Sequence, residues 1–160
     1  LAIVLCWFVM IAFITLRFEF KFAIAAIIAL IIDVSVTLSY FSLFQMEMDS
    51  SFVAALLTVV GYSLNGTIVI FDRIRENLKI HRRSESLSEM IDNSIWQTMG
   101  RSIYTVGTSL FAVVSIFLFG GETIRNFSFA MLVGFSSGAY TSTFLAGPLW
   151  LFLRGKKAGQ

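Results

Sequence analysis

The feature that most constrains the fold is a series of five long apolar runs separated by polar segments. A helix needs about 20 predominantly apolar residues to cross the hydrocarbon core of a bilayer. Hydrophobic residues make up 57% of the 160 residues, which is more than a soluble domain usually carries. We therefore predict an all-α membrane protein, a bundle of five transmembrane helices within residues 1–153. The predicted spans cover about residues 1–16, 23–44, 51–71, 102–119 and 127–153.

The charges between these runs predict an orientation. Ten cationic residues fall on one side of the five-span zigzag, Arg125 falls on the other, and Arg101 lies at a boundary. Lys and Arg are enriched in the cytoplasmic loops of membrane proteins, so the basic side and the tail over residues 154–160 are expected to be cytoplasmic. The N-terminus is then outside, and the first run is expected to be the end of a truncated span. The ten residues are Arg17, Lys21, Arg73, Arg75, Lys79, Arg82, Arg83, Arg154, Lys156 and Lys157.

The longest polar segment, the cytoplasmic connection over residues 72–100, contains a helix-start signal. Ser86 and Glu89 have the S-x-x-E spacing of a capping box, and apolar residues follow at roughly helical spacing. We expect a short amphipathic helix on the cytoplasmic face. The alternative is a solvated helix that merely joins two spans.

The last predicted span carries small residues at every fourth position: Ala130, Gly134, Gly138, Ser142 and Ala146. Small residues let helix backbones approach closely in lipid, so this stripe, with Gly134 and Gly138 at its centre, is expected to pack against a neighbouring helix. Pro148, further along, is expected to bend or loosen the helix.

Several polar residues lie within or at the edge of the predicted spans. An ionised carboxylate at the bilayer centre costs roughly 2.5–3.5 kcal/mol on insertion scales, so Asp33 is either functional or a structural carboxylate satisfied by neighbours. Asn65 and Gly66 interrupt the third run, where Gly61 also permits a close neighbour. Arg101 opens the fourth run and is either functional or directed toward the interface.

The third run ends in the charged sequence DRIREN, residues 72–77. Asp72 and Glu76 are four residues apart, and Arg73 lies three before Glu76, as in a short ion-paired helix that leaves the membrane. A simple positive stop after a span is the alternative. Asp72 is also seven residues beyond Asn65 and so lies on nearly the same helix face. Arg75 and Asn77 complete the run.

Catalytic and metal-binding functions find no support in the residues. The predicted spans hold no His and one carboxylate, so neither a nucleophile–base pair nor a carboxylate pair is present. Cys6 is the only cysteine, and no phosphate-binding loop or metal-ligand cluster appears. We expect no enzyme activity, no cofactor and no metal. The nearly balanced charge also speaks against nucleic-acid binding.

Five stretches together resemble one family. Residues 61–77, GYSLNGTIVIFDRIREN, closely resemble the signature of SecF, a bacterial protein-export membrane subunit, which usually reads G-Y-S-[IL]-N-D-T-[IV]-V-x-x-D-R-I-R-E-N. The other stretches that resemble this family are ALIIDVSVTLSYFSLF (29–44), SFVAALLTVVGYSLN (51–65), NSIWQTMGRSIYTVGTSL (93–110) and LFGGETIRNFSFAMLVG (118–134).

The resemblance implies the C-terminal transmembrane part of SecF, or of a fused SecD–SecF chain, with family spans two to six present. The family belongs to the resistance-nodulation-division superfamily and lies in the bacterial cytoplasmic (inner) membrane. Its implied partners are SecD, the SecYEG channel, YajC and YidC, a translocating preprotein and the lipid bilayer. Its implied function is to assist protein export with the proton motive force.

The resemblance also assigns site residues. Arg101 matches a membrane arginine of the family's proton pathway, Asn65 matches the Asn of its signature, and Asp72 and Arg73 match its D-R pair. Gly66 stands where the family has Asp, the carboxylate most often assigned to that pathway, so Asp33 becomes a candidate substitute. The alternatives are a scaffold subunit that conducts no protons, or a half-permease of the same superfamily.

Overall fold

The computed structural model describes residues 1–80 and 85–155, and this part of the chain is helical and has no strand. It confirms the predicted all-α fold. Residues 156–160 of the predicted basic tail lie outside the described residues, as do Arg82 and Arg83. The elements are α1 (Ala2–Arg17), α2 (Phe20–Leu43), α3 (Ser50–Ile80), α4 (Leu87–Phe119), a 3₁₀ turn (Glu122–Ile124), α5 (Arg125–Tyr140), a π-helical segment (Thr141–Leu145) and α6 (Ala146–Gly155).

Four helical segments of the described chain are long and apolar enough to cross a membrane: α2, α3, α4 and the continuous segment Glu122–Gly155. The first predicted span forms α1, but this helix has only 16 residues. At 1.5 Å per residue it is about 24 Å long, which is shorter than a hydrocarbon core of about 30 Å. The five predicted runs therefore become four helices of spanning length and one shorter apolar helix.

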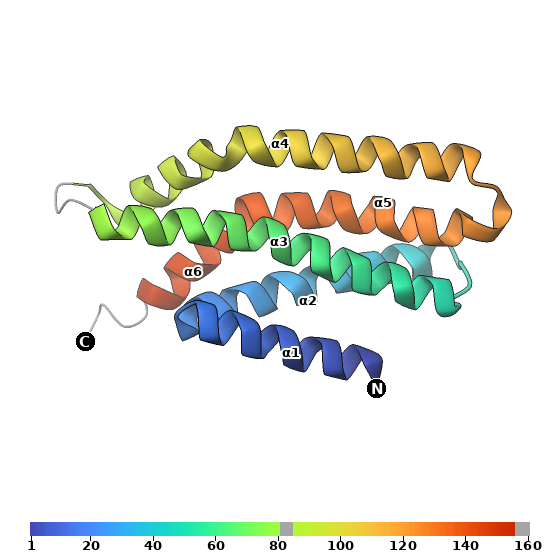
Figure 1. The fold of residues 1–160 in the computed structure, drawn as a ribbon, viewed down its shortest axis with the longest axis horizontal. Coiled ribbons are helices and arrows are strands. Elements are labelled where there is room, and N and C mark those ends of the chain that lie inside the picture. The colour runs from blue at the N-terminus through green and yellow to red at the C-terminus, as the bar shows by residue number, and fades with distance from the viewer. Residues whose placement is uncertain (81–84, 156–160) are drawn as a thin grey trace.

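The helices form an elongated bundle (Figure 1). α3 and α5 make the most extensive pairing of two helices, and α2 packs against both. α4 lies along α3 and α5 on one side, and α1 lies along α2 on the other. The C-terminal ends of α1, α3 and α6 gather at one end of the bundle with the first residues of α4 (Figure 1). This is the end that the loop charges predict to be cytoplasmic.

The amphipathic helix predicted between the third and fourth spans is present, but it is not a separate element. α3 continues without a break to Ile80, and the amphipathic segment is the first part of α4 rather than a helix of its own. The capping box is confirmed, because Ser86 accepts from the Glu89 backbone N–H at 3.2 Å and Glu89 accepts from the Ser86 N–H at 3.1 Å.

The continuity of α4 has a packing reason. Met90, Ile91 and Ile95 are buried in the same core cluster as Ile74 of α3. Both helices therefore remain in contact beyond their apolar runs. Gly100 does not interrupt α4, since one glycine inside a long helix costs only about 1 kcal/mol.

Aromatic side chains fill both ends of the bundle. At the predicted cytoplasmic end, Phe22 stacks on Trp150 with ring centroids 4.8 Å apart and meets Phe71 at 5.0 Å. At the opposite end, the ring centroids of Phe41 and Phe52 lie 4.2 Å apart. A third cluster contains Val59, Val113 and Phe135. Along α2, the buried Asp33 lies between Phe22 and Phe41, which places it in the middle of the bundle.

The small-residue stripe of the last span is fully buried, and two of its glycines face α3. A Cβ added at Gly134 would lie 2.2 Å from a methyl carbon of Val59, and one at Gly138 would lie 3.1 Å from the Ser63 Cβ. The helix then loosens over Thr141–Leu145, where the Ala146 N–H bonds to Thr141 O, five residues back. Pro148, which cannot donate a backbone hydrogen bond, follows shortly after this π-turn.

Candidate functional site

Asp33 lies at the centre of the bundle and is fully buried. The Ser63 hydroxyl of α3 donates a hydrogen bond to one carboxylate oxygen, and the Ser137 hydroxyl of α5 donates to the other at 2.9 Å. The Thr141 side chain of the π-turn also faces the carboxylate. Three helical segments beyond α2 thus direct hydroxyls at a single acid.

Hydroxyl partners suit a carboxylate that changes its protonation state. A hydroxyl donates to an ionised carboxylate, and after rotation it accepts a hydrogen bond from the protonated acid. The Asp33 carboxylate is therefore satisfied in either state without movement of the backbone. The structure shows the satisfied carboxylate that the sequence left as one alternative, and the same hydrogen bonds are compatible with proton transfer.

Arg101 lies beside a pocket between α3, α4 and the last span. The pocket has a volume of about 140 Å³, and its lining includes Asn65, Gly66 and Arg101 together with Ser142 and Thr143. Residues that the sequence placed on two different predicted spans are thus brought together around one pocket. No carboxylate occurs among its described lining residues.

The π-turn connects the Arg101 pocket with Asp33. Thr141 faces the Asp33 carboxylate, whereas the next two residues, Ser142 and Thr143, line the pocket. Gly66 packs directly against this turn, because a Cβ added there would lie 2.9 Å from Ser142 Oγ. Asp33 and Arg101 therefore lie on opposite sides of the same short segment.

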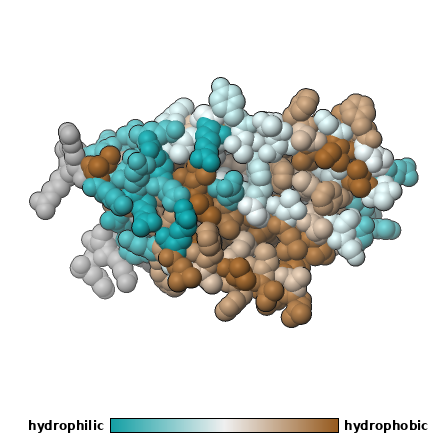
Figure 2. Space-filling view, viewed as in Figure 1, coloured by the Kyte–Doolittle hydropathy of each residue, from teal (hydrophilic) through white to brown (hydrophobic). Residues whose placement is uncertain are grey.

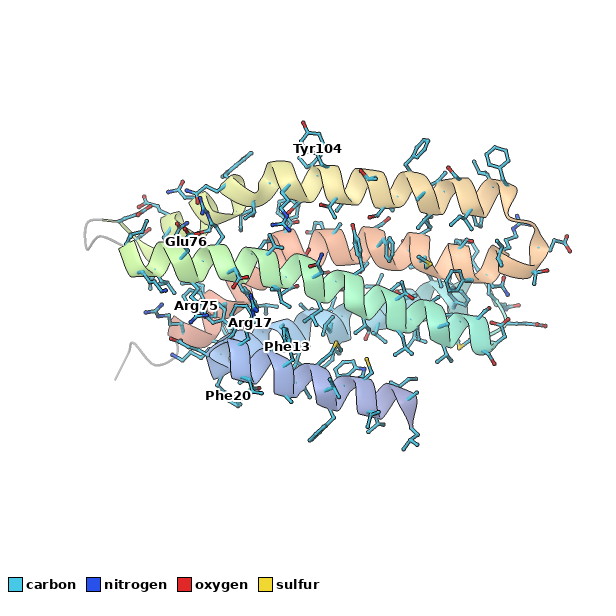
Figure 3. All side chains as sticks on the ribbon, in the orientation of Figure 1. Phe13, Arg17, Phe20, Arg75, Glu76 and Tyr104 are labelled. Carbon is cyan, nitrogen blue, oxygen red and sulfur yellow. The ribbon has the colours of Figure 1, made fainter. Side chains whose placement is uncertain are left out.

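Asp72 does not join this pocket. Its carboxylate lies 3.8 Å from the Arg17 guanidinium at the end of α1, where Arg75 also donates to the Arg17 carbonyl at 3.2 Å. Figure 3 shows Arg17 and Arg75 near each other where α1 ends beside α3. Asp72 and Arg75 thus hold α1 to α3 at the predicted cytoplasmic end.

The rest of the DRIREN run contacts α4. Arg73 pairs with Glu76 at 2.7 Å and donates through Nε to Gln97 at 2.6 Å. Asn77 donates to Ser94 at 2.7 Å and to Gln97 at 3.1 Å. Hydrophilic side chains gather at this end of the molecule, while apolar ones cover much of the remainder of the visible face (Figure 2).

Five partners in these networks were not predicted from the sequence: Ser63, Ser94, Gln97, Ser137 and Thr141. Ser63 lies within the quoted GYSLN stretch, and Ser137 and Thr141 are four residues apart on the same helix face. A search for hydroxyls at helical spacing could have found Ser137 and Thr141.

Gly61, which was expected to permit a close neighbour, is exposed and has no close neighbour in the described structure. No group of three potential metal ligands occurs among the described residues.

The family model described as protein export membrane protein SecD/SecF, C-terminal, matches residues 1–156. The chain is 72% identical over 155 residues to the protein translocase subunit SecF of Acidaminococcus fermentans, a match that covers 97% of this chain and 53% of that protein. It is 42% identical over 149 residues to the protein translocase subunit SecDF of Bacillus subtilis, with 92% of this chain and 20% of that protein covered.

The fold is similar to that of a solved relative. A crystal structure of SecDF, a translocon-associated membrane protein from Thermus thermophilus, superposes with a TM-score of 0.86 at 35% sequence identity, over 91% of this chain and 20% of that one. The chain thus spans about half the length of the SecF protein that it matches and a fifth of the two SecDF proteins. These comparisons confirm the resemblance inferred from the five sequence stretches.

Proposed function

This chain belongs to the SecD/SecF family of protein export membrane proteins, and on that basis we propose that it is the membrane part of a SecF-type accessory subunit of the Sec preprotein translocase. The match over residues 1–156 and the helical bundle support this assignment. In this proposal the protein spans the bacterial cytoplasmic membrane several times, with its C-terminus in the cytoplasm. The basic residues at one end of the bundle support that orientation.

A SecD partner, either separate or fused to this chain, is part of the proposal. Its support is the match to Bacillus subtilis SecDF, of which this chain covers only 20%. The SecYEG channel, YajC and YidC are proposed as further partners, and the substrate is a preprotein that crosses the membrane. The exposed apolar side chains of α1 and α4 provide surfaces for lipid or for these partners.

The observation that carries a proton-driven role is the buried Asp33 carboxylate with its hydroxyl partners. A proton that reaches Asp33 neutralises a charge that is costly within the bilayer. Its release through the π-turn hydroxyls toward the Arg101 pocket would restore that charge. Proton movement would thereby be coupled to the packing of α2 against α3 and α5, because Asp33 contacts all of them.

The test is preprotein translocation into vesicles that hold the full-length parent protein with its partners, measured with and without a proton gradient. We expect Asp33→Asn and Arg101→Ala to remove the stimulation by the gradient while ATP-driven translocation remains. Asp49→Asn, at an exposed carboxylate outside the Asp33 site, is the matched control for a lost charge. If Asp33→Asn retains the full response to the gradient, Asp33 is not the proton carrier.

A second candidate function is a scaffold subunit that conducts no protons. The observation that favours it is the composition of the pocket around Arg101. Its described lining has no carboxylate, because position 66, where the family has Asp, is a glycine. In the same assay a scaffold would show no response to the gradient in the Gly66 form. A response that appears only in Gly66→Asp would support this second function.

A further inference from the structure

The Arg101 side chain is a permanent positive charge at the start of the apolar part of α4. A guanidinium does not deprotonate in proteins, and a charge near the hydrocarbon region requires a partner or water. The ion pairs of the described residues join Arg17 to Asp72 and Arg73 to Glu76, and neither involves Arg101. Within residues 1–80 and 85–155, the Arg101 side chain also makes no hydrogen bond to protein.

The buried acid of the bundle does not supply the missing charge. Asp33 is fully buried and its two carboxylate oxygens already accept from Ser63 and Ser137. It is absent from the lining of the Arg101 pocket, which the π-turn separates from it. The pocket thus has one cation and no anion among its described residues.

The rest of the lining offers hydrogen-bond donors. The Tyr62 hydroxyl is buried and has no partner in the described structure. Asn65 contributes an amide and Thr143 a hydroxyl. A guanidinium with hydroxyl and amide groups is a typical donor set for an anion, whereas a metal cation would be repelled by Arg101.

The size and the remaining walls of the pocket restrict the anion. The volume of about 140 Å³ exceeds the roughly 30 Å³ that a water molecule occupies in the liquid. It therefore accommodates one small ion with a few waters. Val69, Val106 and Ala139 form an apolar part of the wall, whereas Arg101 and Asn65 are exposed. The pocket is therefore open on one side, and an ion can enter it from outside the bundle.

We propose that the pocket beside Arg101 binds a single small monovalent anion, for which chloride is the probe. The ion supplies the negative charge that the bundle itself does not place there. Binding does not depend on the export function, but a chloride requirement of gradient-driven export rests on the proposed function. If export requires chloride, the bound ion supplies the negative charge that a carboxylate at position 66 would supply.

Substitutions at Gly66 test directly whether a carboxylate in the pocket replaces the anion. A Cβ at this position points at Ser142 Oγ, which lines the same pocket, and the contact of 2.9 Å is to a side-chain atom that can rotate. The same Cβ would lie 3.2 Å from the Ser142 Cβ, so Gly66→Asp places a carboxylate in the pocket wall after a shift of a few tenths of an ångström. Gly66→Asn has nearly the same shape and no charge, and it is the matched control.

The experiment is equilibrium binding of radiolabelled chloride to the purified full-length complex, at constant ionic strength with gluconate as the replacement anion. We expect saturable binding in the unmodified protein, and Gly66→Asn measures the effect of the added side-chain volume without its charge. In Gly66→Asp and Arg101→Gln the affinity should fall by at least about tenfold, which corresponds to about 1.4 kcal/mol. Thermal unfolding of each variant in gluconate verifies that the proteins are folded.

Three results of the chloride measurement would each overturn the proposal. They are the absence of saturable chloride binding, binding that is equal in Arg101→Gln, and binding that Gly66→Asp leaves unchanged. Arg101-dependent binding of a lipid phosphate or of a partner carboxylate, without chloride binding, also overturns it. Saturable chloride binding without proton-gradient stimulation of export would leave the anion site intact and would refute the proton-driven function, so the two failures are distinguishable.

Discussion

The contact between Gly134 of α5 and Val59 of α3 gives a prediction with a calculable cost. A Cβ at Gly134 would lie 2.2 Å and 2.5 Å from the two methyl carbons of Val59 and 2.9 Å from its Cβ. No relaxed structure contains such contacts, so Gly134→Ala requires that α3 and α5 move apart. Overpacking of a filled core typically costs about 1–3 kcal/mol, and contacts this short favour the upper part of that range.

Helix propensity opposes this cost. Alanine stabilises a helix interior by up to about 1 kcal/mol relative to glycine, so the net change in Gly134→Ala is smaller than the clash alone. Gly107→Ala isolates the propensity contribution, because a Cβ at Gly107 of α4 meets nothing within 4 Å. We expect the free energy of unfolding of Gly134→Ala to lie about 1–3 kcal/mol below that of Gly107→Ala.

The assay is reversible unfolding of the full-length protein in mixed micelles, followed by circular dichroism. Val59→Ala removes the two nearest methyl groups but leaves the Cβ contact of 2.9 Å, so it should rescue Gly134→Ala in part, with a coupling energy of about 0.5–3 kcal/mol. Equal stability of Gly134→Ala and Gly107→Ala would show that α3 and α5 do not approach as closely as the structure describes. Additive effects of Gly134→Ala and Val59→Ala on the free energy of unfolding would lead to the same conclusion.

Three further predictions concern a cap, the buried acid and an exposed carboxylate. Ser86→Ala removes the side-chain cap of α4 and should cost about 1 kcal/mol, seen as faster amide exchange in the first turn, while exposed Ser88→Ala should have no such effect. Asp33→Ala leaves two hydroxyls without their acceptor and should cost about 1–3 kcal/mol in unfolding free energy; Asp33→Asn keeps one acceptor oxygen and should cost less. Hydrogen bonds from the Ser51 hydroxyl and the Phe52 N–H lower the pKa of Asp49 from its usual value of 3.8. Because the pKa of Asp49 is lower in the folded state, its stabilisation of the start of α3 is present above pH 3.8 and is lost as the pH falls through the lowered pKa. Amide exchange at Phe52, corrected for the intrinsic rate at each pH, will report this loss. A corrected exchange rate that does not change with pH in this range would contradict the prediction.

The helices themselves could be predicted from the sequence, since each depends on residues close together in the chain. The apolar runs, the capping box at Ser86 and the small-residue stripe through Gly134 all indicate structure through local spacing. The resemblance to the family, rather than local spacing, singled out Asn65, Gly66 and Arg101, and the structure shows that they line one pocket. Local spacing also predicted the amphipathic helix, but it did not show that this segment and the fourth apolar run form one helix, α4. The polarity of a segment does not indicate where a helix ends when both parts pack on the same neighbour.

The partners of the buried and charged groups were decided by the tertiary structure. Asp33 accepts from residues 30 and 104 positions away in the sequence, and Asp72 contacts α1 instead of the face that it shares with Asn65. These pairings depend on the rotation and register of whole helices, which the fit of Gly134 and Gly138 against α3 fixes at close range. The sequence by itself therefore determined which segments are helical and enter the membrane, because hydrophobicity and backbone hydrogen bonding act locally. Which side chains meet was determined only by packing, because it depends on distances between segments that are remote in the chain.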